Sequence, residues 1–183
     1  MNLDGFALPV KKLKGTDPVE MLDLSGKDLG VASSVVIASL ISVNCGLRAL
    51  DLSFNELKDE GVSAVCEAIQ SNKETKLASL NFEDNGIGPV GAKSVAAMVA
   101  VTGGLTRVDV RRNNIAGDGA EQISATVLGN LKIEMFNEIP IKEMRANSLT
   151  ELDLNGEGVG VEGGMVVAGL IPVMGALTQV LAF

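Results

Sequence analysis

Apolar residues recur along the chain in one fixed spacing, with other residue types between them. The segments LRALDLSFNEL (47–57), LASLNFEDNGI (77–87) and LTRVDVRRNNI (105–115) share the frame L-x-x-L-x-L-x-x-N-x-L. VEMLDLSGKDL (19–29) and LTELDLNGEGV (149–159) repeat its apolar places. Within each frame, apolar residues alternate with others, which predicts a short strand with one buried side.

An apolar stretch with helical spacing follows each frame, as in GVSAVCEAIQ after the frame 47–57. From Val19 to Leu105 the frames are 28, 30 and 28 residues apart. A regular period of this length predicts a solenoid in which each strand-and-helix rung packs on the next. The expected helices open at one equivalent glycine in each rung, namely Gly61, Gly91, Gly119 and Gly163.

The interval between Leu105 and Leu149 predicts one additional, shorter rung. LGNLKIEMFNEI (128–139) fits the frame with Leu128, Leu131 and Ile133 at apolar places and Phe136 where Asn would stand. We therefore expect a short rung with little helix over 128–148. LPVKKL (8–13) also matches IPIKEM (139–144), which predicts a partial short rung over 1–18. With a partial rung over 177–183, these units form a single domain over 1–183.

The frame resembles that of the leucine-rich repeat superfamily, and its period is similar to that of the ribonuclease-inhibitor-type repeats. The resemblance implies an α/β solenoid, or horseshoe, with a concave parallel β-sheet and convex helices. It also implies that an Asn at the ninth place of the frame bonds backbone groups between rungs. Asn55, Asn85 and Asn113 match that place, whereas Lys27, Phe136 and Glu157 occupy it elsewhere, so we expect a broken ladder there.

The residues between the apolar places should point outward and form the concave surface. Seven strands about 4.8 Å apart would give a surface roughly 30 Å across, which is wide enough for one protein partner. Its central column reads Asp23, Asp51, Asn81, Asp109, Lys132 and Asp153. The expected partner-binding residues on this surface are Asp51, Glu83, Arg107, Asp109, Arg111, Lys132 and Asp153.

Arg107, Arg111 and Lys132 interrupt an otherwise acidic surface, and two readings of them are open. They could hold an acidic loop of a partner, or each could neutralise carboxylates on neighbouring rungs. The second interpretation follows because Arg111 would be aligned with Glu83 and Glu134 on the adjacent strands of the expected ladder.

Composition excludes several classes of function. The chain of 183 residues has a net charge of −8 and no His, Trp or Tyr. The negative net charge argues against nucleic acid and anionic membranes as partners and favours a neutral or basic protein surface. Neighbouring carboxylates of the central column could serve acid–base or metal chemistry, but without His we expect neither, and we expect no cofactor. Cys45 and Cys66 suggest no disulfide framework, and we expect both to be small buried residues of a cytoplasmic protein.

Two further motifs admit a second interpretation. Gly86, Gly88 and Gly91 form G-x-G-x-x-G, a spacing that cradles pyrophosphate in dinucleotide-binding folds. Only Gly91 recurs in the other rungs, so we interpret the match as accidental. The nearly uncharged segment 163–183 has the length of a membrane anchor, but the repeat frame already assigns it to helix, turn and strand.

A non-enzymatic protein-interaction scaffold is the function that these features favour. Two alternatives remain. The resemblance also covers regulators of enzymes, including nuclease inhibitors and activators of the Ran GTPase, and the strand at 177–183 could support end-to-end assembly through an exposed edge.

Overall fold

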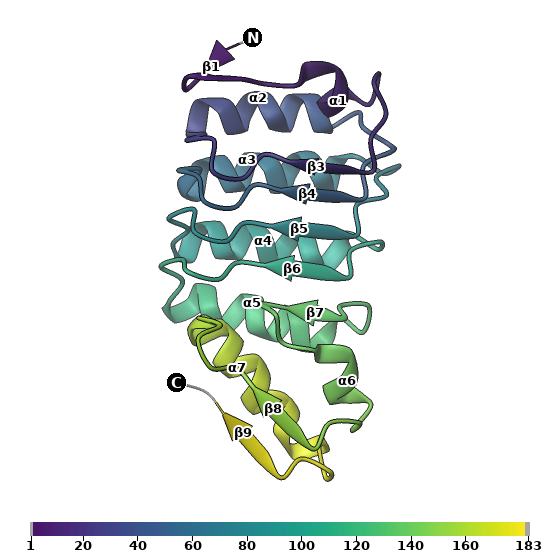
Figure 1. Cartoon of the computed structure of the whole chain (residues 1–183), viewed down its shortest axis with the longest axis vertical. Helices are drawn as coiled ribbons and strands as arrows, with labels where there is room; N and C mark the ends of the chain where they lie inside the picture. Colours follow the sequence, from purple (N-terminus) through teal and green to yellow (C-terminus); the bar gives the residue numbers. More distant parts are fainter. Residues whose placement is uncertain (1, 182–183) are drawn as a thin grey trace.

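The computed structural model describes residues 2–181 and shows a curved stack of rungs, with strands along one side and helices along the other (Figure 1). The main sheet has five parallel strands in chain order: β3 (Met21–Asp23), β4 (Ala49–Asp51), β5 (Ser79–Asn81), β6 (Arg107–Asp109) and β7 (Met135–Phe136). The helices behind it are α2 (Val31–Ile41), α3 (Lys58–Ser71), α4 (Pro89–Val101) and α5 (Gly117–Gly129). The period predicts a solenoid, and this one has the α/β leucine-rich repeat architecture that the resemblance implies.

Smaller elements stand at both ends of this sheet. At the N-terminal end, β1 (Asn2–Leu3) and β2 (Phe6–Ala7) form an antiparallel pair followed by the short helix α1 (Val10–Lys14). At the other end, α6 (Ile141–Arg145), β8 (Glu151–Asp153), α7 (Gly160–Leu170), the 3₁₀ helix η1 (Ile171–Val173) and β9 (Gln179–Leu181) follow β7. Both α1 and α6 begin directly after a proline, Pro9 and Pro140, and each has five residues. The matching segments at 8–13 and 139–144 thus form the same local structure.

The apolar places of the frame lie in register and point away from the concave surface. Leu22, Leu50, Leu80 and Val108 are aligned on successive strands, and all are buried. The equivalent glycines permit close approach of neighbouring rungs. A Cβ added at Gly119 would lie 2.6 Å from the Cα and carbonyl oxygen of Pro89, a contact that the backbone of α4 does not allow.

The Asn ladder is present where the frame carries Asn. Asn55 Nδ2 donates to the carbonyls of Leu24, Leu52 and Ser53, and its Oδ1 accepts from the N–H groups of Lys27 and Leu29. Asn85 and Asn113 make equivalent bonds one and two rungs further on. These amides satisfy backbone groups that the turn leaves without partners, which holds successive rungs at a fixed distance.

A second row of polar side chains follows the ends of the convex helices and was not anticipated. Asn44, Asn72 and Asn130 each donate through Nδ2 to a carbonyl of the preceding rung and accept a local N–H through Oδ1. Thr102 occupies the same place after α4, with nearly the same backbone angles as Asn72. Its buried hydroxyl has no hydrogen-bond partner among the described residues.

The short rung lies in a different register from the one that the sequence suggested. The expected strand would have presented Asn130, Lys132 and Glu134, but β7 begins at Met135, which pairs with Arg107. Helix α5 continues to Gly129 and takes up the residues assigned to the start of the rung. Phe136 therefore does not stand at the Asn place: it is fully buried and aligned with Val108. A large aromatic side chain fits the core better than the inter-rung turn, and this preference sets the register.

The concave sheet is also narrower than the seven strands expected. β8 pairs with β9 in a separate two-stranded sheet, with Asp153 opposite Leu181, and the main sheet ends at β7. The chain turns back at Phe136, which bridges Ile139 in the antiparallel sense, so β7 is too short to pair with β8. In Figure 1 the unit containing β8, α7 and β9 is tilted away from the line of the upper rungs.

The apolar segment at the C-terminal end forms α7, η1 and β9, as the repeat frame predicts, while Phe183 lies outside the described residues. Among residues 2–181, no helix has both the length and the apolar character needed to cross a membrane. Cys66 is buried, and burial raises the pKa of its thiol. The expectation of a buried Cys45 is wrong: Cys45 is exposed because it lies in the turn after α2 rather than on the inner side of the helix.

Candidate protein-binding surface

The glycine-rich motif lies at the N-terminus of α4, and a carboxylate already binds this terminus. The N–H of Gly88, at the N-cap of α4, donates to Asp59 Oδ1 at 2.6 Å. A Cβ at Gly91 would approach that same oxygen to 2.6 Å. A carboxylate of the preceding rung thus takes the place where a phosphate would bind a helix N-terminus. The N–H of Gly30 at α2 donates in the same way to Asp4 Oδ2, at 2.9 Å.

The concave surface is hollowed over the strands β3 to β6. The hollow has a volume of about 390 Å³. Its floor is formed by the small side chains of Ala49 and Ser79, and Met21 and Arg107 stand on the strands at either side. Carboxylates line the same hollow, namely Asp23, Asp51, Asp109 and Glu138.

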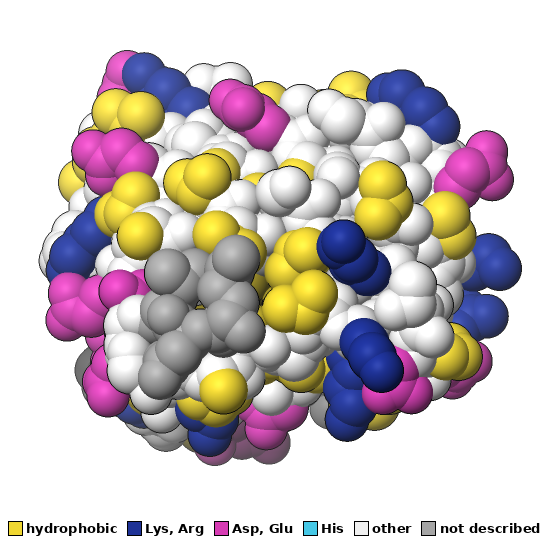
Figure 2. Space-filling view, turned by 90° about the horizontal axis from the view of Figure 1, so that it is seen from above, with side chains coloured by type: hydrophobic (Ala, Val, Ile, Leu, Met, Phe, Trp, Pro, Cys, Tyr) yellow, Lys and Arg dark blue, Asp and Glu magenta, His cyan; other side chains and the backbone are white. Residues whose placement is uncertain are grey.

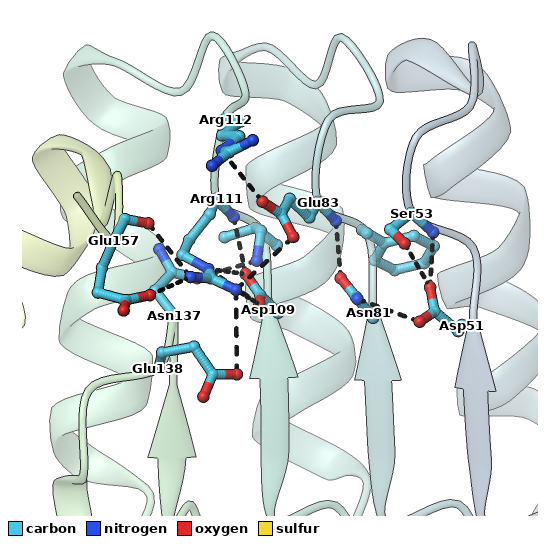
Figure 3. A network of polar contacts seen from close by, with 12 residues as sticks. Asp51, Ser53, Asn81, Glu83, Asp109, Arg111, Arg112, Asn137, Glu138 and Glu157 are labelled. Carbon is cyan, nitrogen blue, oxygen red and sulfur yellow. Dashed lines mark hydrogen bonds and ion pairs between the residues drawn. The ribbon is translucent and has the colours of Figure 1, made fainter. Parts of the chain in front are cut away.

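Charged side chains converge where β5 and β6 end, as Figure 3 shows. We call this group the Arg111 cluster; its members are Glu83, Asp109, Arg111, Arg112, Glu138 and Glu157. The Arg111 guanidinium lies 2.8 Å from Asp109 Oδ2, 2.6 Å from Glu157 Oε2 and 3.6 Å from Glu83 Oε2. Arg112 Nε lies 3.2 Å from Glu83 Oε1. The cluster joins four rungs, because Glu83 follows β5, Asp109 ends β6, Glu138 follows β7 and Glu157 follows β8.

Burial and charge act against each other in this cluster. The side chains of Arg111, Asp109 and Glu83 are only 13, 7 and 10% exposed. Burial raises the pKa of Glu83, while the charge of Arg111 opposes that rise. For Arg111, burial alone would lower the pKa, but the hydrogen bond to Asp109 and the neighbouring carboxylates outweigh it and raise the pKa. The charges of Arg111, Asp109 and Glu83 are therefore stabilised mainly by their partners rather than by water.

A buried polar junction lies beside the cluster, between the main sheet and the α7 unit. Asn137 accepts the N–H of Val110 through Oδ1 and donates through Nδ2 to the carbonyl of Val159 and to Glu162 Oε1. Glu162 is 3% exposed, and burial raises the pKa of its carboxyl group. These side-chain bonds link the two units where no strand pairing continues from β7 to β8.

The expected partner-binding residues fall into different places. Glu83, Asp109 and Arg111 come together, but they are buried in mutual contacts. Asp51 and Arg107 line the hollow, and Asp153 is exposed on β8 outside the main sheet. Lys132 is exposed in the turn after α5 rather than on a strand, because of the register of β7.

Sequence reasoning missed several members of the surface. Glu138, in the turn after β7, pairs with Arg107 at 2.7 Å and lines the hollow. Arg112 follows the strand and pairs with Glu83. The hydrophobic spacing would have revealed Glu138 only with the correct register, in which Phe136 takes an inward place. Among residues 2–181, no group of three or more His, Cys, Asp or Glu side chains is arranged to hold a metal ion.

Comparison with known proteins agrees with this architecture. The family described as Leucine Rich repeat matches residues 43–66, 73–96 and 105–124. RAN GTPase-activating protein 2 of Arabidopsis thaliana is 30% identical over 121 residues, covering 66% of this chain and 22% of that protein. Ribonuclease inhibitor of Mus musculus is 29% identical over 140 residues, covering 76% of this chain and 28% of that protein. Protein CARMIL of Dictyostelium discoideum is 28% identical over 176 residues, covering 88% of this chain and 16% of that protein.

A solved structure, that of Leiomodin-1 Actin-Binding Site 2, superposes with a TM-score of 0.61 at 18% identity. It covers 70% of this chain and 75% of the solved one, and the likeness concerns the fold alone. The chain belongs to the leucine-rich repeat superfamily, with repeats of the ribonuclease-inhibitor type. It spans less than a third of the length of each of the three relatives named above.

Proposed function

We propose that this chain is a non-enzymatic protein-interaction scaffold that binds a protein partner on its concave surface and the adjoining loops. The observation that carries the proposal is the hollow over β3 to β6, which is open to solvent and built on a regular sheet. The inter-rung Asn bonds fix this surface before any partner arrives, so binding costs little conformational entropy. The convex side is taken up by helices that pack on one another.

The residues expected to bind divide into two roles. Asp51 and Arg107, which line the hollow, would touch a partner directly. Glu83, Asp109 and Arg111 would instead hold the surface in shape through their mutual contacts. Lys132 and Asp153 would contribute only to a partner that extends past the edges of the hollow.

The acidic balance of the chain favours a neutral or basic protein partner over nucleic acid or a membrane. We place this interaction in the cytoplasm, where the free thiols of Cys45 and Cys66 would persist.

Site-specific photo-crosslinking tests the scaffold proposal. p-Benzoylphenylalanine at Ala49, on the concave floor, should give covalent adducts with a discrete protein in cells. The same group at Glu67, exposed on the convex helix α3, serves as the matched control. Adducts of equal yield and identity from both positions, or adducts from Glu67 alone, would contradict a concave binding surface.

Regulation of a GTPase is a second candidate, favoured by the similarity to RAN GTPase-activating protein 2 over 121 residues. Its test is the rate of GTP hydrolysis by Ran with and without the chain. A rate that rises in proportion to the added chain supports a regulator, and an unchanged rate at high concentration rejects it.

Self-association through the terminal rungs is a third candidate. The side of α7 that corresponds to the inter-rung side of α3 is exposed: Ala168 and Ile171 occupy the places of Cys66 and Ile69, which are buried. Hydrophobic side chains also appear on the opposite end of the stack, together with charged ones (Figure 2). Light scattering over a wide concentration range should show a mass that rises above 18.9 kDa, and a constant mass would reject assembly.

A further inference from the structure

The hollow on the concave surface has a floor of small side chains with the large, flexible side chain of Met21 beside it. Met21 of β3 is 77% exposed and lies in register with Ala49 and, one strand further, Ser79. On the two neighbouring strands the equivalent side chains, Ala49 and Ser79, are small. Met adapts its shape to varied apolar partners, and the open space above Ala49 and Ser79 gives it something to pack against only when another molecule is present.

Two carboxylates at this end of the hollow form no ion pair within residues 2–181, although the charge of Lys27 acts on Asp23 from further away. Asp23 and Asp51 are directly opposed on β3 and β4, whose backbones are about 4.8 Å apart. Each uses Oδ1 to accept the N–H and the hydroxyl of the serine two residues later, at 2.6–2.9 Å. Within residues 2–181, neither carboxylate has an ion pair shorter than 4.0 Å.

The serine bonds fix the orientation of both side chains. The hydroxyl and the N–H of Ser25 lower the pKa of Asp23, so this group carries its charge at neutral pH. Asp51 Oδ2 receives only a long contact of 3.4 Å from Asn81 Nδ2. The Oδ2 atoms of the two carboxylates are consequently the parts of the pair best placed to receive a cation.

The other end of the hollow is electrically different. Arg107 is held by both oxygens of Glu138, at 2.8 and 2.7 Å, and Asp109 is held by Arg111. The lining of the hollow contains four carboxylates and one guanidinium, so its formal charge is −3. Since Arg107 and Arg111 pair with Glu138 and Asp109, the carboxylates of the hollow that are left without an ion pair among residues 2–181 are Asp23 and Asp51, next to Met21.

We propose that this hollow binds an extended segment of a protein partner in which a Lys or Arg stands beside an aliphatic residue. The cation bridges Asp23 and Asp51, and the aliphatic side chain lies on Ala49 and Ser79 against Met21. The inference rests on the proposed scaffold function and assigns the chemistry of the segment that the scaffold takes. Bringing a cation between two opposed carboxylates also relieves their mutual repulsion, which adds to its attraction.

The test is an NMR titration of the chain labelled with ¹³C at its Met methyl groups. The probes are three peptides, acetyl-GLKLKLG-amide, acetyl-GLQLQLG-amide and acetyl-GLELELG-amide. The signal of Met21 is assigned with the variant Met21→Leu. The exposed Met165 on α7 reports non-specific attraction to this acidic protein.

The expected result is a saturable shift of the Met21 signal with the Lys peptide, at least fivefold weaker binding of the Gln peptide and no binding of the Glu peptide. Asp51→Asn and Asp23→Asn should each weaken the Lys peptide at least fivefold, while Glu67→Gln on the convex side leaves it unchanged. Asn retains the Oδ1 acceptor for the serine bonds, so these variants should stay folded, which the remaining Met signals verify.

Three results would overturn the inference: no shift of Met21, equal binding of the Lys and Glu peptides, or unchanged binding by both Asn variants. Crosslinks from Ala49 to a protein partner, together with failure of all three peptides, would reject this segment chemistry and leave the scaffold proposal standing.

Discussion

Removing the Arg111 cation should destabilise the fold far more than removing an exposed one. Arg111→Met keeps a long apolar stem but leaves the carboxylates of Asp109 and Glu83, 7 and 10% exposed, without their main partner. Loss of one partner from a buried ion pair costs about 3–5 kcal/mol. The 2.6 Å bond to Glu157, whose side chain is 43% exposed, adds little to that figure. We therefore expect Arg111→Met to lower the free energy of unfolding by about 3–5 kcal/mol at pH 7.

Urea-induced unfolding measures this loss without the screening that guanidinium chloride would introduce. The matched control is Lys93→Met, which breaks an exposed pair with Asp118 and should cost about 0–1 kcal/mol. The deficit of Arg111→Met should shrink at pH 5, because the abandoned carboxylates can then take up protons. A loss below about 1 kcal/mol at pH 7, or the same loss at pH 5, would show that the cluster is not a mutually dependent buried network.

Three further substitutions test separate features. Thr102→Asn should supply the amide donor that Asn44, Asn72 and Asn130 provide at the other helix ends, and it should raise the free energy of unfolding in urea by about 1 kcal/mol. The reverse change Asn72→Thr should lower it, and no gain from Thr102→Asn would show that these amides do not stabilise the stack. Glu162 has a raised pKa, so the folded state takes up a proton before the unfolded state does, and the free energy of unfolding should rise as pH falls from 7 toward 4.5. Glu162→Gln should remove this rise in urea titrations at pH 7 and 5, and an identical pH dependence in both proteins would refute the assignment to Glu162. Phe54 has a φ of +56° where Gly26 stands in the preceding rung, and Asn adopts this left-handed conformation more readily than Ala. Phe54→Asn should therefore have a free energy of unfolding about 1 kcal/mol higher than Phe54→Ala and a higher thermal midpoint; equal midpoints would exclude backbone strain there.

The repeating frame was sufficient to predict the fold because its signal is summed over many rungs. Alternation around Leu50, Leu80 and Val108 fixed which side chains point inward, and the register of β3 to β6 follows it. The same spacing placed Asp51 and Arg107 on the concave surface. A frame repeated four times tolerates local irregularity without losing its phase.

The short rung was misplaced because one copy of a weak frame competed with a stronger local preference. Leu131 looked like an inward residue, yet it is 82% exposed, while Phe136 took the buried place. The burial of Glu83 and Asp109 also escaped the sequence, since it depends on Arg111 and on Glu157, 46 residues further along the chain. Contacts between rungs of different length cannot be derived from a single period.

The central claim is that the concave surface is where this chain holds a protein partner. Its most direct test is the affinity of the crosslinked partner for Ser79→Arg, which fills the floor of the hollow, compared with Glu67→Arg on the convex side. The account predicts that Ser79→Arg weakens binding at least tenfold while Glu67→Arg binds as the wild type does. Equal affinity of both variants would contradict it.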